Sequence, residues 1–326
     1  MRTGCLIAAV SIAASCVWAQ AETKREGRGR KERAADSQPA AAADDSAGAV
    51  REVYRKVGDV QLKVHIFNPP DHKPTDKRPA IVFFFGGGWL HGSAGQFVPQ
   101  CRYFASRGMV AITADYRVYT RNKAMIADCT SDAQAAVRWV RANAGRLGID
   151  PDRIAAGGGS AGGHLAAATG TLDDFTGDKN AKISFRPNAM LLFNPAIDLT
   201  PEEPKPGDEG SRHSNLMARM GARPEELSPM DHVRPGLPPT IIFHGKDDKL
   251  IPFTKIEEFG KAMKAAGNHC EVVGFEGQGH GFFNPGKRGN KHFIETMRLA
   301  DEFLASLGYL KGKPTIVKDA STTRPG

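Results

Sequence analysis

The sequence predicts an α/β protein in which a mainly parallel sheet is covered by helices on both faces. Short apolar segments typical of buried strands recur along the chain, and segments with apolar residues at helical spacing lie between them. Four of the strand-like segments run directly into loops rich in glycine or charge. Because the chemistry of a parallel sheet gathers beyond the carboxyl ends of its strands, these loops are the first place to look for a site.

The elements follow one another in a regular alternation. The expected strands are 60–67, 80–85, 109–114, 154–157, 190–193, 240–244 and 271–275. The expected helices are 128–147, 253–266 and 292–307, of which the first repeats apolar residues near helical spacing and the second is amphipathic. Strands separated by helices in this way favour parallel pairing, which needs a long crossover connection.

The amino-terminal residues are typical of an export signal. Arg2 precedes an apolar run over 5–18 that is too short to span a bilayer, and residues 19–21 match an A-x-A cleavage site. We therefore expect a signal peptide at 1–21 and a secreted or periplasmic protein. Lipid anchoring at Cys16 is a less favoured alternative, because the residues before it match a lipoprotein box poorly.

The remaining chain divides by composition. Residues 22–49 are charged and then Ala-rich without a periodic apolar face, which predicts a disordered tether. We expect one catalytic domain at 50–311 and a flexible tail at 312–326. The net charge of +8 is partly concentrated in the tether, where a solvated basic segment is the favoured interpretation. Neither a nucleic-acid partner nor a transmembrane segment of the mature chain is predicted, and the oligomeric state is left open.

Three cysteines remain after removal of the signal, namely Cys101, Cys129 and Cys270. An exported compartment permits disulfides, and a bridge between Cys101 and Cys129 is one hypothesis. The chain has no Cys-x-x-Cys motif or Cys/His cluster, so we predict neither a metal nor a cofactor.

Ser160 is the leading candidate for a nucleophile. It lies where the apolar strand 154–157 gives way to a helix, between Gly158 and Gly162, in a Gly-x-Ser-x-Gly pattern. Glycines on both sides let the backbone bend tightly and expose the serine hydroxyl, and the helix that begins there directs free N–H groups at the same point. His280 is the best candidate for its base, since it stands in a glycine-flanked loop directly after a late strand. His164, four residues after Ser160, is expected to be a packing or hydrogen-bonding residue.

Four motifs in order carry a resemblance to a known fold. They are Gly-Gly-Gly-Trp at 86–89, Gly-Gly-Ser-Ala-Gly-Gly at 158–163, His-Gly-x-x-Asp at 244–248 with Leu250 and Pro252, and Gly-His-Gly-Phe at 279–282. With these motifs the chain from about residue 60 to 307 resembles the α/β-hydrolase fold. Within that fold it is similar to hormone-sensitive-lipase-like and acetyl-xylan or feruloyl-type esterases.

The resemblance implies roles for the matching residues. Ser160, Asp248 and His280 would form a catalytic triad in the family's chain order, with Asp247 as the rival carboxylate. The N–H groups of Gly87, Gly88 and Ala161 would form an oxyanion hole, and Trp89 would either line the substrate pocket or pack under the loop. Phe85 departs from the family, which commonly has His there. We expect it to pack into the core and the loop to be anchored in another way.

The predicted function is that of a serine carboxylic-ester hydrolase with an acyl-enzyme intermediate. The proline-rich residues 198–239 predict a small, stiff cap at most, which favours short-acyl or aromatic esters such as acetyl and feruloyl esters of small molecules or carbohydrates. Two alternatives stay open. One is an amide hydrolase, either a prolyl-oligopeptidase-like peptidase or an arylformamidase, and the other is a non-catalytic binding protein on the same fold.

Overall fold

The computed structural model describes residues 48–178, 182–200 and 216–316. The predicted signal peptide, nearly all of the predicted tether, residues 201–215 of the predicted cap and residues 317–326 of the predicted tail lie outside the described residues.

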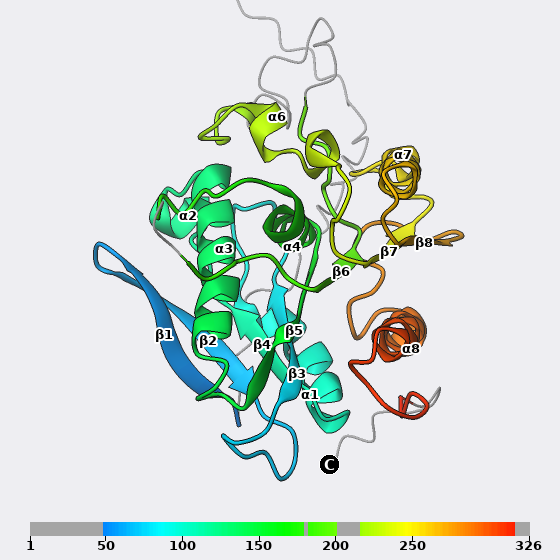
Figure 1. Ribbon diagram of the computed structural model, residues 1–326. Coiled ribbons are helices and arrows are strands. Elements are labelled where there is room, and N and C mark those ends of the chain that lie inside the picture. The colour runs from blue at the N-terminus through cyan, green and yellow to red at the C-terminus, as the bar shows by residue number, and fades with distance from the viewer. Residues whose placement is uncertain (1–47, 179–181, 201–215, 317–326) are drawn as a thin grey trace, which may run out of the picture. The chain divides into compact units, whose positions relative to one another are not determined.

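The described residues form an eight-stranded sheet with the order β1-β2-β4-β3-β5-β6-β7-β8 (Figure 1). The strands are β1 Val50–Val57, β2 Val60–Phe67, β3 Arg78–Phe84, β4 Val110–Ala114, β5 Ile149–Gly159, β6 Ala189–Phe193, β7 Thr240–Gly245 and β8 Cys270–Phe275. Strands β3 to β8 are parallel, while β2 runs antiparallel to both β1 and β4. The carboxyl ends of the parallel strands therefore meet at one edge, as the sequence predicts.

The burial of each strand matches its place in the sheet. Every residue of β4, β6 and β7 is buried, and their sequences are nearly continuous apolar runs, because helices cover both faces of the sheet there. In β2, by contrast, buried Leu62 and Val64 flank the exposed Lys63. This alternation is typical of a strand near a sheet edge with one solvated face.

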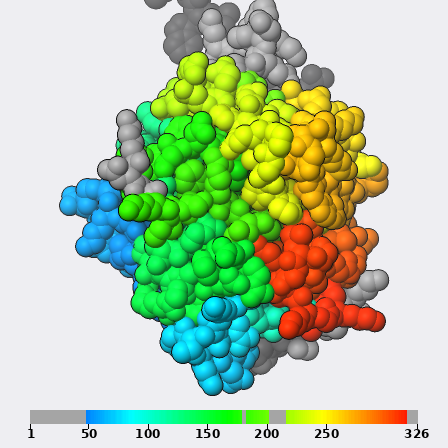
Figure 2. Space-filling view, in the orientation of Figure 1, coloured from blue at the N-terminus to red at the C-terminus, as the bar shows by residue number. Residues whose placement is uncertain are grey.

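Helices cover the sheet in two layers. Their bounds are α1 Val98–Ser106, α2 Tyr119–Asn122, α3 Ile126–Ala142, α4 Ala161–Thr171, α6 Pro224–Leu227, α7 Phe253–Ala265 and α8 Lys291–Ser306, with short 3-10 helices at η1 Ala94–Phe97, η2 Pro229–His232 and η3 Arg288–Asn290. The apolar residues of α3, α4 and α7 pack into one core cluster, and those of α1 and α8 pack into the other. In the described part of the predicted cap, residues 216 and 217 are helical and the short helices α6 and η2 follow, and this part lies beside α7 in the space-filling view (Figure 2).

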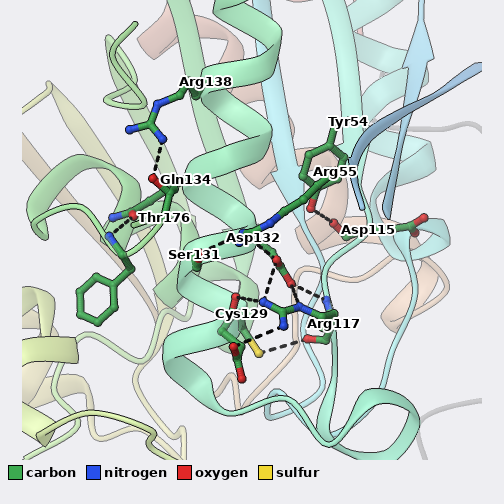
Figure 3. A network of polar contacts seen from close by, with 12 residues as sticks. Tyr54, Arg55, Asp115, Arg117, Cys129, Ser131, Asp132, Gln134, Arg138 and Thr176 are labelled. Carbon is green, nitrogen blue, oxygen red and sulfur yellow. Dashed lines mark hydrogen bonds and ion pairs between the residues drawn. The ribbon is translucent and has the colours of Figure 1, made fainter. Parts of the chain in front are cut away.

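A buried charge network fastens the β1–β2 hairpin to the helical layer (Figure 3). The fully buried Asp132 of α3 accepts hydrogen bonds from the guanidinium of Arg117 and lies 2.9 Å from the guanidinium of Arg55 in β1. Arg55 also donates to the Ser131 hydroxyl, and the Tyr54 hydroxyl donates to the backbone carbonyl of Asp115. The two arginines compensate the charge of a carboxylate that would be costly to bury alone.

The three cysteines of the described residues are buried free thiols, so the hypothesis of a Cys101–Cys129 disulfide is wrong. Cys101 belongs to the core cluster of α1 and α8, whereas Cys129 belongs to the cluster of α3 and α4 on the opposite face of the sheet. The sheet itself separates the two sulfur atoms. Burial raises the pKa of the thiols, to about 11 for Cys270, which keeps them protonated.

Candidate active site

Ser160 occupies the sharp turn between β5 and α4. Its φ of 54° and ψ of −120° lie in a region that side-chain-bearing residues rarely adopt. A Cβ on Gly158 would lie 2.3 Å from the Gly162 carbonyl oxygen, and one on Gly162 would lie 2.0 Å from the Phe84 carbonyl oxygen. Both positions therefore need glycine for the helix to start so close to the sheet. The Ser160 N–H donates to the Phe193 carbonyl at 2.9 Å, which fixes the turn to β6.

The structure brings Ser160, His280 and Asp248 into one hydrogen-bonded line. The Ser160 Oγ lies 2.9 Å from Nε2 of His280, and Nδ1 of the same ring lies 2.7 Å from Oδ2 of Asp248. The three residues follow β5, β8 and β7, so the sheet places them at the same edge although up to 120 positions separate them in sequence. With an ionised carboxylate as acceptor, Nδ1 carries the ring proton and Nε2 presents its lone pair to the serine hydroxyl.

Asp248 is held as an anion and in a fixed orientation. Its Oδ1 accepts hydrogen bonds from the backbone N–H groups of Leu250 at 2.8 Å and Ile251 at 3.1 Å. Burial of the carboxyl raises its pKa, but the His280 hydrogen bond and charge together with these N–H groups outweigh that effect and lower the pKa below its ordinary value. Asp247, the rival candidate, has an exposed side chain, and its backbone N–H binds the Gln278 carbonyl. The structure thus brings Asp248, and not Asp247, to His280.

The loop after β3 lies against Ser160. A Cβ on Gly86 would stand 3.4 Å from the Ser160 Cβ. Gly87 and Gly88 adopt φ values of 122° and 61°, which glycine tolerates without strain. The carbonyl of Gly87 accepts from the N–H groups of Leu90 and His91. Within the described residues the N–H groups of Gly87, Gly88 and Ala161 donate to no protein acceptor, so they are available to an anionic oxygen.

Phe85 is packed in the core, and amide side chains anchor the loop instead. The Phe85 ring stacks on Tyr116 with centroids 4.0 Å apart, and the Tyr116 hydroxyl donates to the Phe85 carbonyl at 2.8 Å. The Gly86 N–H donates to Oε1 of Gln96 at 2.6 Å, and Nε2 of Gln96 donates to Oδ1 of Asn284 at 2.9 Å. Asn284 in turn donates to the Gly281 carbonyl at 2.9 Å. Gln96 and Asn284 therefore join the loop after β3 to the loop that carries His280.

Asn194, directly after β6, completes this set of amides. Its Oδ1 accepts from the Gly281 N–H at 3.2 Å, and its Nδ2 lies 3.4 Å from Nε2 of His280. Sequence reasoning missed Gln96, Asn194 and Asn284. Asn194 could have been found, since it follows a buried strand at the edge where the other site residues gather. Nothing local distinguishes Gln96 or Asn284 from ordinary loop residues.

Trp89 and His164 pack against each other beneath the loop. The Trp89 side chain is buried, with 5% of its surface exposed, and its ring meets the His164 ring edge-on at 5.2 Å. This geometry favours the packing interpretation of Trp89 over a pocket wall. His164 is fully buried, its Nε2 lies 2.8 Å from the Leu227 carbonyl, and burial lowers its pKa to about 4. It therefore acts as a neutral hydrogen-bond donor, as expected from its position.

A cavity of about 310 Å³ opens beside His280. It is lined by Gln278, Gly279, His280, Phe282, Lys287 and Arg288. Across the described ranges, no group of three or more His, Cys, Asp or Glu side chains could hold a metal ion. A search of the same ranges finds no helix that is both long and apolar enough to cross a membrane.

The strand order and the turn at Ser160 define an α/β-hydrolase fold, and the hydrogen-bonded line of Ser160, His280 and Asp248 lies at the carboxyl ends of its strands. The chain belongs to the BD-FAE family, whose sequence profile matches residues 64–263.

Solved and curated relatives agree with this assignment. The apo form of Thermogutta terrifontis esterase 2 is 51% identical with a TM-score of 0.78, and the match covers 82% of this chain and 98% of that one. Esterase LipC of Mycobacterium tuberculosis is 29% identical over 64% of this chain, and carboxylesterase NlhH of the same species is 29% identical over 70% of it and 73% of NlhH. The chain spans about half the length of the first curated relatives, 54% of LipC and 46% of the Arabidopsis thaliana protein ICMEL1. The fold and the carboxylesterase resemblance predicted from the motifs are confirmed.

Proposed function

We propose that the chain is a serine carboxylic-ester hydrolase that works through an acyl-enzyme on Ser160. The observation that carries the proposal is the line from the Ser160 Oγ to His280 at 2.9 Å and from His280 to Asp248 at 2.7 Å. A serine hydroxyl is a weak nucleophile until a neighbouring base takes its proton, and this line supplies that base and orients it.

The reaction divides into two halves. Ser160 Oγ attacks the ester carbonyl while its proton moves to Nε2 of His280, and the N–H groups of Gly87, Gly88 and Ala161 hold the oxygen that becomes negative. The protonated ring then gives its proton to the departing alcohol, which leaves an acyl group on Ser160. A water molecule, deprotonated by His280 in its turn, attacks the acyl-enzyme and releases the acid. Asp248 stabilises the imidazolium that exists between these steps.

The proposed substrates are short-acyl or aromatic esters, including acetyl and feruloyl groups on carbohydrates. The related Thermogutta terrifontis esterase was solved with propionate bound and with butyrate bound, which supports a short acyl site in this chain. The secreted or periplasmic location inferred from residues 1–21 is part of the proposal, because it would give the enzyme access to esters outside the cell.

Chemical labelling tests the nucleophile directly. A fluorophosphonate should label one serine and abolish turnover of nitrophenyl acetate, and Ser160→Ala should lose both labelling and activity while keeping its thermal midpoint. Ser106→Ala, at the end of α1, serves as the matched control and should behave as wild type. Labelling that persists in Ser160→Ala would overturn the assignment. Turnover of formanilide or peptide substrates above that of esters would favour the amide-hydrolase alternative. If the wild type shows no labelling and no turnover, the binding-protein alternative would be favoured.

A further inference from the structure

The cavity beside His280 is built by one stretch of chain between β8 and α8. It is lined by Gln278, Gly279, His280 and Phe282, and further along the same stretch by Lys287 and Arg288, which make up its cationic wall. The ammonium nitrogen of Lys287 lies 3.5 Å from the point where a Cβ on Gly281 would stand, which places it beside the residue that follows His280. The cavity therefore has a proton-transferring imidazole and a cationic wall.

The cations of this wall have no countercharge of their own. Among the described residues, neither Lys287 nor Arg288 forms an ion pair or a side-chain hydrogen bond. The acidic groups near the loop are already engaged, since Asp248 binds His280 and Glu276 binds Lys246. Of the other lining residues, Gln278, Gly279 and Phe282 carry no ionisable side chain.

The next residues increase the positive charge. Lys291 begins α8, and the described first turn of that helix carries no acidic side chain. Cations at the amino-terminal end of a helix are unfavourable, because the free N–H groups there already make that end positive. Lys287, Arg288 and Lys291 thus accumulate charge where the fold alone would favour carboxylates.

The chemistry of the proposed reaction decides which part of a substrate faces this wall. His280 must bring Nε2 within hydrogen-bond reach of the departing alcohol oxygen, while the carbonyl oxygen points to the N–H groups of Gly87, Gly88 and Ala161. The alcohol portion of the ester therefore leaves along the loop that carries His280, and the cavity begins there.

We propose that this cavity binds a carboxylate carried on the alcohol portion of the ester, so that the preferred substrates are short-acyl esters of hydroxy acids or of acidic sugars. The inference rests on the proposed ester hydrolysis and adds a substrate class to it. An anion in the cavity would offset the uncompensated charge of Lys287 and Arg288 and would hold the alcohol oxygen near His280.

A matched pair of substrates tests this. The acetyl esters of 4-hydroxyphenylacetate and of 4-hydroxyphenylacetamide differ in charge but have similar leaving groups, and each kcat/KM is normalised to the rate of hydroxide-catalysed hydrolysis. For the wild type, the normalised kcat/KM of the anionic ester should exceed that of the neutral ester by about 5-fold or more. This ratio should fall towards 1 as the salt concentration rises from about 20 mM to about 500 mM, because added ions screen exposed charges. Lys287→Gln/Arg288→Gln should lower the ratio about fivefold at low salt.

Control variants distinguish binding of the anion in the cavity from a general effect of the protein's positive charge. Lys56→Gln/Lys63→Gln removes the same charge from exposed positions on β1 and β2, at the sheet edge opposite β8, and should leave the ratio unchanged. A wild-type ratio of 1, or an equal loss in both double variants, would overturn the subsite. A preference for phenyl hemisuccinate over phenyl butyrate would move the anion to the acyl side and would also overturn it. Absence of turnover on both esters would instead contradict the proposed function on which the subsite depends.

Discussion

Gln96 anchors the loop after β3, in which Phe85 occupies the position where the family resemblance implies a histidine. Its carbonyl oxygen fixes the Gly86 N–H, and its amide nitrogen reaches Asn284 in the loop that holds His280. One side chain thus sets the distance between the N–H groups that would receive the negative oxygen and the imidazole that would deliver the proton. Such positioning matters because small displacements of reacting groups lower rates steeply.

Substitution of Gln96 should therefore reduce turnover more than binding. Gln96→Leu removes both hydrogen bonds, and we expect kcat to fall about 10- to 100-fold with KM changed less than about threefold. Gln96→Glu keeps an acceptor for the Gly86 N–H but loses the donor to Asn284, so its kcat should lie between those of Gln96→Leu and wild type. Steady-state kinetics on nitrophenyl acetate measures both constants. Equal kcat in all three proteins would contradict the positioning role.

His164 should make the stability of the protein depend on pH. Its pKa of about 4 in the folded protein lies below the value near 6.5 of an exposed histidine. As pH falls from 6.5 to 4, the unfolded chain takes up a proton that the folded chain does not, so the free energy of unfolding decreases. The stability present above pH 6.5 is thus lost progressively in that window, at about 1.4 kcal/mol per pH unit from this group.

The variant His164→Gln isolates that contribution. Glutamine can keep a donor to the Leu227 carbonyl but does not titrate. Urea unfolding at pH 7.0, 5.5 and 4.5 should show the wild type losing about 1.4 kcal/mol per pH unit relative to the variant. Parallel pH dependences for the two proteins would show that His164 does not carry the effect.

The connection between β5 and α4 is the element on which the site depends most. A Cβ on Gly162 would meet the carbonyl oxygens of Phe84 and Phe85 at 2.0 and 2.4 Å, and both are backbone atoms at the end of β3. Backbone cannot yield as a flexible side chain does, so α4 would have to move away from β3. That movement would carry Ser160 and the Ala161 N–H with it.

Gly162→Ala should accordingly impair both stability and activity. We expect a loss of about 2 to 3 kcal/mol in the free energy of unfolding, typical of overpacking, together with a kcat at least about 10-fold lower. Gly145→Ala is the matched control, because a Cβ there would meet no described atom within 4 Å. Its stability should be unchanged or slightly higher. A stable, active Gly162→Ala would indicate that the turn tolerates more space than these distances allow.

Sequence patterns predicted strands β2 to β8 but missed strand β1 and helix α1. Strands β3 to β8 were predicted because continuous apolar runs separated by helices leave few other arrangements. Strand β1 was not expected, since only its Tyr54 is buried and charged residues occupy most of its other positions. Helix α1 was missed too, and α3 ends at Ala142 rather than at the predicted 147. Helix ends depend on local capping that periodicity does not reveal.

The residues of the site also differ in whether the sequence alone could predict them. Ser160, His280 and the glycines around them follow from turn geometry at strand ends, which is a local property. The Gln96–Asn284 pair joins residues 188 positions apart, and that contact depends on how two loops meet in the folded chain. The family motif already favoured Asp248 over Asp247, and the fold buries Asp248 and exposes Asp247.

At the scale of the whole molecule, we expect the small cap between β6 and β7 to limit the length of acyl chain that the site can accept. The described part of the segment between β6 and β7 contains the helical residues 216 and 217 and the helices α6 and η2, each of which is four residues long. Each methylene of an acyl chain adds about 0.8 kcal/mol to the binding free energy, but only if a pocket buries it. We therefore expect kcat/KM for nitrophenyl esters to be highest from acetyl to butyryl and to drop at octanoyl and beyond. A steady rise to dodecanoyl, or activation at an oil–water interface, would contradict a short acyl site.

The separation of the thiols by the sheet has a practical consequence. Cys101, Cys129 and Cys270 are hidden on the two faces of the sheet and have raised pKa values, so maleimides should spare them. In a chain that begins after Cys16, a cysteine introduced at the exposed position 56 on β1 would be the thiol that reacts. A dye or a solid support attached there would sit at the edge of the sheet opposite β8. The protein is thus suited to oriented immobilisation without removal of any native cysteine from its folded domain.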